Sequence, residues 1–287
     1  MASEMKSPLE VRGLCKKYPS FTLDHVSFSL VPGEITGFIG RNGAGKTTTI
    51  NSILSLVHPD EGEVSFGGLT FAEHEKEIKE KIGFVSAGMT YYVRKPLKKI
   101  TEVVRSFYPG WDDSVYRKYM NAFGLAEDKT PAALSNGMKI KYALTLALSH
   151  GADLLILDEP TSGLDPVSRE ELIEIFLNLK DAGKTVFFST HITSDLEKCA
   201  DRILFLQNGR LQADERLDDF RGAWVIAETD GEIPADLAAV SRGACRVRGG
   251  YTVLLRREDA EQYPVREATL DEIMVHLEKN TEEEASV

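Results

Sequence analysis

A glycine-rich segment of nine residues, Gly40–Thr48, has the composition and spacing of a phosphate-binding loop. It reads GRNGAGKTT and matches the pattern GxxxxGK[ST]. Backbone N–H groups of such a loop turn towards phosphate oxygens, and the N-terminus of the following helix adds a favourable dipole. Lys46 can reach the β- and γ-phosphates, and the Thr47 hydroxyl can bind Mg²⁺. The segment therefore predicts a site for a nucleoside phosphate and magnesium.

Two adjacent acids form a second candidate site. The segment LLILDEP, residues 154–160, is an apolar run that ends in Asp158 and Glu159. Open α/β sheets place ligand chemistry at the carboxyl ends of their strands. We expect Asp158 to hold Mg²⁺ through its water, and Glu159 to orient or deprotonate the water that attacks the phosphate.

The elements that position these residues follow from hydrophobic patterning. Short apolar runs and amphipathic stretches alternate over the first 220 residues or so, which predicts an α/β fold. A helix is expected from Thr48 onward, and helical spacing between Leu97 and His150 predicts a helical insertion between two strands of one sheet. Asn208-Gly209 between two apolar runs predicts a hairpin. The expected strands are residues 9–12, 26–30, 34–39, 63–66, 81–85, 154–157, 185–189 and 202–206.

The pattern changes after about Gly222. A strand, a weak helix, a hairpin and a final helix are expected in that order, which indicates a small appended α+β domain of βαββα type. Its expected elements are residues 224–227, 235–240, 245–256 and 270–279. We therefore predict a domain of residues 1–222, with a helical subdomain at about 88–150, and a second domain of residues 223–287 with an acidic tail.

Composition excludes several classes of protein. The 34 basic and 45 acidic residues give a net charge of −11, so nucleic acid is not expected as the main partner. No apolar run approaches the roughly 18 residues of a membrane-spanning helix. The N-terminus lacks the pattern of a secretory signal, which favours the cytosol. Cys15, Cys199 and Cys245 match no metal-ligand spacing, and we expect ordinary reduced cysteines.

A third motif, Leu134–Met138, reads LSNGM. Alone it indicates a helix N-terminus capped by Ser135. Together with the two sites above it resembles the LSGGQ signature of the nucleotide-binding subunit of ATP-binding-cassette (ABC) transporters, with Asn136 and Met138 in place of Gly and Gln. In that family the signature Ser and second Gly bind the γ-phosphate held by the opposite subunit. The resemblance implies this role for Ser135 and Gly137.

The resemblance extends over about residues 8–215. Ser162–Asp165 resembles the D-loop that joins two subunits, and His191 resembles the switch histidine. Tyr18 stands where the family has an aromatic residue that stacks on adenine, although a core tyrosine is the alternative. The family implies a P-loop ATPase fold with a mixed β-sheet core and a helical subdomain, and ATP and Mg²⁺ as cofactors. The implied catalytic residues are Lys46, Glu159 and His191, the nucleotide-binding residues are Tyr18, Asn42, Gly43, Ala44, Gly45, Lys46, Thr47, Thr48, Ser135, Gly137 and Asp165, and the metal ligands are Thr47 and Asp158.

One family element is absent from the sequence. The strand before residue 86 should lead through Pro to a Gln that touches Mg²⁺ and senses the membrane partner, but Ser86 and Ala87 occupy these positions. The following residues, 89–99, mix aromatic and basic side chains where the family docks its membrane subunit. Metal coordination and coupling are therefore expected to differ from the family pattern.

The resemblance implies an ATPase subunit that dimerises, as a homo- or heterodimer, around two ATP molecules and powers a separate membrane permease. The permease would hold this cytoplasmic chain at the inner face of the membrane. Met138, the phrase FYPGW at 107–111 and the phrase STHITSD at 189–195 resemble exporters of antimicrobial or amphipathic peptides and drugs, including lantibiotic-immunity, bacitracin-type and phenol-soluble-modulin exporters. Alternatives are an importer ATPase, or a soluble ABC ATPase that acts on ribosomes or DNA.

Overall fold

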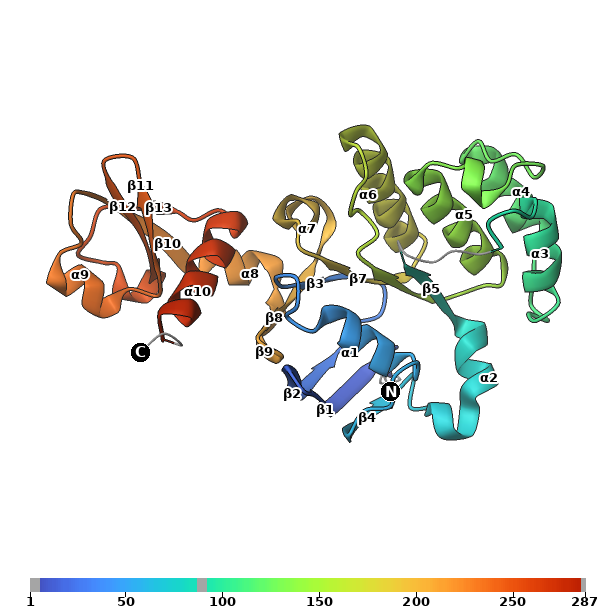
Figure 1. Cartoon of the computed structure of the whole chain (residues 1–287), viewed down its shortest axis with the longest axis horizontal. Coiled ribbons are helices and arrows are strands. Elements are labelled where there is room, and N and C mark those ends of the chain that lie inside the picture. Colours follow the sequence, from blue (N-terminus) through green and yellow to red (C-terminus); the bar gives the residue numbers. More distant parts are fainter. Residues whose placement is uncertain (1–5, 87–91, 285–287) are drawn as a thin grey trace, which may run out of the picture. The chain divides into compact units, whose positions relative to one another are not determined.

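The structure is a computed structural model that describes residues 6–86 and 92–284. Its elements are shown in Figure 1. The chain divides into two compact units, Met1–Asp214 and Glu215–Val287, which are described separately below. The domain boundary expected after residue 222 stays a prediction. Over the described ranges, the helices are too short or too polar to cross a bilayer.

A six-stranded sheet organises the first unit, with the strand order β5-β6-β7-β3-β8-β9. The pairs β5–β6, β6–β7, β7–β3 and β3–β8 are parallel. Every residue of β3, β6 and β7 is buried, as expected for parallel strands covered on both faces. The strands are β3 (Ile35–Ile39), β5 (Ile82–Ser86), β6 (Leu154–Asp158), β7 (Thr185–Thr190), β8 (Arg202–Gln207) and β9 (Arg210–Arg216).

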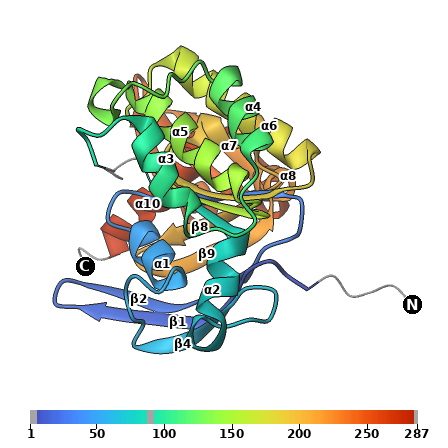
Figure 2. The ribbon, with the colours of Figure 1, turned by 90° about the vertical axis from the view of Figure 1, so that its right-hand side faces the viewer.

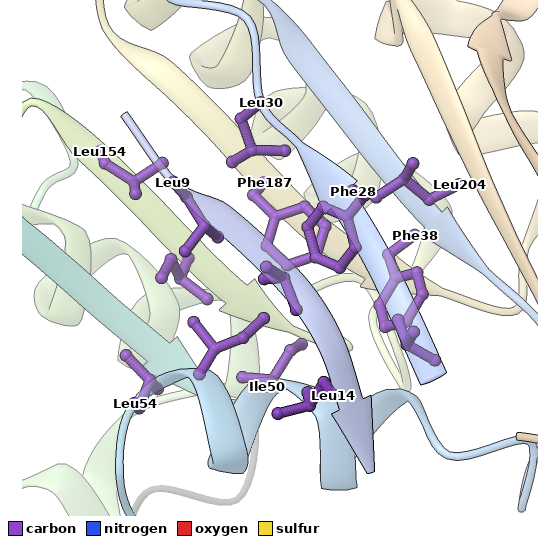
Figure 3. Close-up of a cluster of buried hydrophobic side chains, with 14 of the residues drawn as sticks. Leu9, Leu14, Phe28, Leu30, Phe38, Ile50, Leu54, Leu154, Phe187 and Leu204 are labelled. Atoms are coloured by element: carbon purple, nitrogen blue, oxygen red, sulfur yellow. The ribbon is translucent and has the colours of Figure 1, made fainter. Parts of the chain in front are cut away.

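A three-stranded antiparallel sheet forms another layer of this unit, with the order β2-β1-β4. Its strands are β1 (Glu10–Tyr18), β2 (Phe21–Ser29) and β4 (Glu61–Ser65), and α1 (Lys46–Ile53) lies beside it (Figure 2). Figure 3 shows the apolar core between the sheets, where the rings of Phe28, Phe38 and Phe187 gather. Their ring centroids lie 5.5 to 6.2 Å apart. This core fixes the start of α1 against the ends of the parallel strands.

The opposite face of the parallel sheet is covered by helices. Phe188, the residue after Phe187, packs on Phe176 with 5.3 Å between ring centroids. Because successive strand residues point to opposite faces, β7 contacts both layers. The covering helices are α6 (Pro166–Asp181) and α7 (Thr193–Cys199), and α2 (Phe71–Lys81) precedes β5.

The helical insertion predicted between Leu97 and His150 is confirmed, and it joins the neighbouring strands β5 and β6. A buried hydroxyl group ties it together: Thr101 Oγ1 lies 3.1 Å from the hydroxyl of Tyr116 and 2.9 Å from that of Tyr142. The Tyr142 hydroxyl also donates to the Leu97 carbonyl at 3.0 Å. The elements are α3 (Leu97–Arg105), α4 (Asp113–Ala122), the 3₁₀ helix η1 (Pro131–Ala133) and α5 (Asn136–Ser149).

The second unit contains a four-stranded sheet of order β11-β12-β10-β13. The predicted hairpin and both predicted helices are confirmed, whereas α8 and β13 were not anticipated. Strand β13 is three exposed residues long and carries no apolar run. The elements are α8 (Leu217–Gly222), β10 (Trp224–Asp230), α9 (Ala235–Val240), β11 (Ala244–Val247), β12 (Gly250–Arg256), the 3₁₀ helix η2 (Arg257–Asp259), β13 (Val265–Glu267) and α10 (Leu270–Glu284).

Several predicted boundaries need correction. The strands expected at 9–12 and 26–30 are too short, because β1 and β2 continue through register shifts that interrupt their alternating pattern. Helix α1 begins at Lys46, before the expected Thr48. The hairpin at Asn208-Gly209 is confirmed, and both residues adopt positive φ, 48° and 77°, as a tight two-residue turn requires.

Candidate functional site

The phosphate loop connects β3 to α1 through glycines with positive φ, 87° at Gly43 and 110° at Gly45. A Cβ on Gly45 would lie 2.6 Å from Cζ of Phe21, so only glycine fits beneath this aromatic ring. Helix α1 has neither an acidic residue in its first turn nor a side-chain cap. Its first N–H groups therefore remain available for an anion, as the sequence predicts.

Lys46 is buried at the start of α1, and its ammonium group is surrounded by acceptors. Nζ donates to the carbonyl of Gly40 at 2.6 Å and to that of Arg41 at 3.3 Å. The same Nζ lies 3.1 Å from Oε1 of Glu159. The chain thus brings the lysine of the phosphate loop and the second acid of the LLILDEP segment together.

Asp158 ends β6 as a buried carboxylate with two hydroxyl donors. Thr47 Oγ1 lies 3.0 Å from Oδ2, and Ser189 Oγ donates to Oδ1 at 2.7 Å. Ser189 Oγ also accepts the backbone N–H of Glu159 at 2.9 Å. Ser189 lies on β7, parallel and adjacent to β6, and therefore orients both acids.

Glu159 is held in an uncommon backbone conformation, with φ of 50°. Its Oε2 lies 2.8 Å from Nδ1 of His191. Because a carboxylate can only accept, Nδ1 of His191 carries the proton in this contact. With Lys46 on one oxygen and His191 on the other, the Glu159 carboxylate is clamped in one orientation.

Lys46, Thr47 and Glu159 line a hollow of about 550 Å³, the nucleotide hollow, and Asp158 and His191 contact two of these lining residues. Tyr18 lines it and is 41% exposed, with Nζ of Lys16 5.9 Å from its ring centroid. Ala44 does not line the hollow; it is buried, and its carbonyl accepts the N–H of Gly209 at 3.0 Å. The lining residues are Tyr18, Pro19, Ser20, Phe21, Arg41, Asn42, Gly43, Gly45, Lys46, Thr47, Thr48 and Glu159.

The signature residues are placed elsewhere in the first unit. Ser135 caps α5 and accepts the N–H of Met138 at 3.2 Å. Gly137 is buried, and a Cβ there would lie 3.3 Å from Cβ of Ser168. Among the described residues, Ser135, Gly137 and Asp165 are not part of the lining of the nucleotide hollow.

Asp165 caps α6 and thereby links the D-loop segment to the signature helix. Its carboxylate accepts the N–H groups of Val167 and Ser168 at 3.1 Å, and the Ser168 hydroxyl at 2.6 Å. These hydrogen bonds hold the pKa of Asp165 below its usual value, and the bond from the Ser168 hydroxyl contributes most. Because Gly137 packs on Ser168, the two motifs form one local structure.

Of the two positions where the family has Pro and Gln, the structure describes Ser86 but not Ala87. Ser86 ends β5 and stands opposite Asp158 in the parallel register. Ala87 and Tyr91 lie outside the described residues. Tyr92, the first described residue after this gap, is 69% exposed.

Several known proteins are similar to this chain in sequence and in fold. The ABC transporter family matches residues 23–162. The bacitracin transport ATP-binding protein BcrA of Bacillus licheniformis is 33% identical over 211 residues, which cover 72% of this chain and 69% of that protein. The chain belongs to the ABC transporter family. The ABC transporter ATP-binding protein YtrB of Bacillus subtilis (strain 168) is 28% identical over 259 residues, 88% of either chain. Among solved structures, an ATP-binding subunit of an ABC transporter is 31% identical, with a TM-score of 0.68 over 75% of this chain and 92% of its own.

Membership of the ABC transporter family confirms the resemblance and the fold class predicted from the motifs. The chain is an ATP-binding subunit of this family, with the mixed sheet and helical region that the sequence implied. Sequence reasoning missed Ser189, which contacts both acids, and Phe21, which lies over Gly45. Ser189 directly precedes the Thr190-His191 pair, so its place at the strand tip was the signal available for it.

Proposed function

We propose that this ATPase hydrolyses ATP in the nucleotide hollow and powers a separate membrane permease that exports antimicrobial or amphipathic peptides or drugs. The observation that carries the catalytic part is the position of Glu159, clamped between Lys46 and His191 at the wall of the nucleotide hollow. A carboxylate in a fixed orientation beside a phosphate loop is suited to aligning a water molecule for attack on a γ-phosphate.

Lys46 connects binding to catalysis in this proposal. An ammonium group has three donors, and two point at the carbonyls of Gly40 and Arg41. The γ-phosphate would take the donor directed at Glu159, which frees Oε1 to orient the attacking water and to accept its proton. His191 stays on Oε2 and maintains the orientation of the carboxylate. Tyr18, at the open side of the hollow, would stack on adenine.

The residues around Asp158 suit a magnesium ion. Thr47 and Asp158 offer oxygen atoms 3.0 Å apart, and Mg²⁺ prefers oxygen ligands while it keeps several waters. Asp158 would hold the ion through a water molecule, and Ser189 would orient the carboxylate. When bound, the ion neutralises charge on the β- and γ-phosphate oxygens.

Two copies of the chain, or this chain and a related one, would complete each ATP site. Ser135 is exposed and Gly137 is buried at the start of α5, and neither lines the nucleotide hollow, so in this proposal they serve the γ-phosphate of another subunit. The N-terminus of α5 carries no acidic residue in its first turn, which favours an anion there. Asp165 would hold the D-loop at this contact.

The permease would dock in an apolar groove of about 650 Å³, the helical groove, which is bordered by α2, β5, α3 and α5. Phe107, at its edge, is 72% exposed, and Tyr108 stacks on His150 with 3.9 Å between ring centroids. Charged residues of α2 form its rim. A segment with apolar side chains flanked by charges would suit this surface. The docking places the cytoplasmic chain at the inner face of the membrane. The lining residues are Leu54, Leu56, Phe71, Glu75, Lys76, Lys79, Glu80, Ile82, Phe84, Val104, Phe107, Tyr108, Ala143, Leu146, Ala147 and His150.

Export is supported by the similarity to BcrA, a bacitracin transport ATP-binding protein. The test is to purify the tagged chain from membranes of its own cells, and to reconstitute the complex into inside-out vesicles. ATP-dependent uptake of bacitracin into these vesicles is the expected result. Uptake only in right-side-out vesicles would favour an importer. Sedimentation of the chain with ribosomes, without a membrane protein, would favour the soluble alternative.

A further inference from the structure

The three-stranded sheet carries a cluster of metal-ligand side chains that the nucleotide chemistry does not use. Cys15 on β1, His25 on β2 and Glu61 on β4 come from three adjacent strands. The thiol sulfur, one imidazole nitrogen and one carboxylate oxygen all lie within 4.8 Å of one another. Within the described parts of the chain, no other group of histidine, cysteine and acidic residues meets so closely.

Strand irregularities create this cluster. Leu14 pairs with Val26 and Lys16 pairs with Leu23, so two residues of β2, Asp24 and His25, stand opposite Cys15 alone. Such a bulge redirects a side chain and breaks the alternation of a strand. His25 has a φ of 48°, and its N–H donates to Sγ of Cys15 at 3.2 Å.

The other side of the cluster is set by β4. Cys15 and Glu61 are direct partners in the antiparallel register, and a register shift lies between Arg12 and Cys15. Gly62 follows with a φ of 99°, and a Cβ there would lie 2.5 Å from the carbonyl oxygen of Gly13. The close approach of β1 and β4 at this point therefore brings the carboxylate next to the thiol.

Asp24 fixes the histidine for ligation. Its Oδ1 lies 2.6 Å from Nδ1 of His25, and its Oδ2 accepts from Nε of Arg210 at 2.8 Å. Because the carboxylate can only accept, Nδ1 carries the proton and Nε2 keeps its lone pair. Metal-bound histidines usually have such a carboxylate on the other ring nitrogen.

We propose that Cys15, His25 and Glu61 bind one divalent transition-metal ion of the zinc type, with water as the fourth ligand. A thiolate, an imidazole and a carboxylate are ligands that zinc accepts together. Bonds of about 2.0 to 2.3 Å in tetrahedral geometry place ligand atoms about 3.3 to 3.8 Å apart. The exposed side chains of His25 and Glu61 can rotate by the small amount required, while Cys15 stays buried and loses its proton on binding.

The test uses Co²⁺ alone as the probe, added to the full chain without nucleotide, followed by competition with Zn²⁺. We expect one equivalent of Co²⁺ to give the visible bands of four-coordinate cobalt and a sulfur-to-cobalt charge-transfer band, and Zn²⁺ to displace it. The charge-transfer band separates this site from the nucleotide hollow, whose lining residues and adjacent Asp158 include no sulfur ligand.

Variants assign the ligands. Cys15→Ser should lose the charge-transfer band, and His25→Ala and Glu61→Gln should weaken affinity by at least about tenfold. Asp24→Asn, which removes the positioning carboxylate, should weaken it by about 10- to 100-fold while the band keeps its position. The matched controls are Cys245→Ser, a buried cysteine of the other unit, and Glu63→Gln, an exposed acid of the same strand as Glu61.

The result that overturns the proposal is a charge-transfer band that survives Cys15→Ser, or an affinity that His25→Ala and Glu61→Gln leave unchanged. Because His25 and Glu61 are exposed, these two variants should fold even where Cys15→Ser does not. Zn²⁺ should also raise the unfolding temperature of the unmodified chain and not that of His25→Ala. An equal rise in both proteins would contradict the site.

Discussion

The nucleotide hollow and the helical groove are two concave surfaces of the same unit with opposite construction. The nucleotide hollow is lined by polar groups whose partners are already in place, such as Lys46 with Glu159 and the Thr47 hydroxyl with Asp158. The helical groove is lined mainly by apolar side chains, with charges only at its rim and with Phe107 largely exposed. The nucleotide hollow thus holds its polar groups in fixed positions, whereas the helical groove presents mainly apolar surface.

The same contrast extends to the ionisable groups of the helical groove. Burial lowers the pKa of His150, so the imidazole is neutral at physiological pH, and burial raises the pKa of Tyr108. The stacked pair thus adds no charge to the groove. A surface of this kind gains binding energy from apolar area, while the nucleotide hollow gains it from directed hydrogen bonds.

The largest effect should come from removing the central cation of the nucleotide hollow. Lys46→Ala removes the cation expected to contact the phosphates and leaves the Glu159 carboxylate with His191 as its remaining contact. We expect ATP affinity to fall by at least about 100-fold, measured by calorimetry. Lys184→Ala, which breaks an exposed ion pair with Asp153, is the control and should bind ATP normally.

Ser189→Ala should give the next largest effect. It distinguishes the orientation of Asp158 and Glu159 from the binding of ATP. The variant keeps both acids but loses the hydroxyl that contacts Asp158 and the N–H of Glu159. Turnover should fall by about 10- to 100-fold, as for other residues that orient metal ligands, with ATP affinity nearly unchanged. Ser29→Ala, at the exposed end of β2, is the control. A normal turnover rate in Ser189→Ala would show that the two acids do not need this residue.

Phe107→Ala tests the helical groove and should leave the nucleotide hollow intact. Because the side chain is 72% exposed, its loss should cost little stability. We expect the permease to dissociate or to lose its stimulation of hydrolysis, a change of several-fold, with basal hydrolysis unchanged. Val167→Ala removes an equally exposed apolar side chain from α6, outside the groove. Equal coupling in both variants would place the docking surface elsewhere.

The smallest effect is expected at Ser86, which stands opposite Asp158 in the register at the end of β5. The hydroxyls that contact Asp158 in the structure belong to Thr47 and Ser189. Ser86→Ala should therefore change Mg·ATP affinity by less than about twofold, the range of an ordinary surface substitution. A large loss of Mg·ATP affinity would make Ser86 a metal ligand and would correct this view of the site.

The phosphate loop and the pair of acids could be predicted because the residues of each motif are adjacent in sequence. Spacing alone joins Lys46 and Thr47 to a helix start, and Asp158 and Glu159 to a strand end. Ser189 and Phe21 were missed because their roles depend on strand neighbours and on the space above Gly45. The Cys15 cluster was missed for a related reason, since bulges and cross-strand pairing, which leave no periodic signal, bring its members together.

We propose that Glu159 promotes hydrolysis while the rest of the nucleotide hollow binds ATP. The test measures the ATP affinity and the ATP hydrolysis rate of Glu159→Gln. Glu171→Gln, on the exposed face of α6, is the control. We expect unchanged ATP affinity, turnover reduced by about two to three orders of magnitude, and a dimer that accumulates with ATP bound. Rapid hydrolysis by Glu159→Gln in a folded, ATP-binding protein would contradict it.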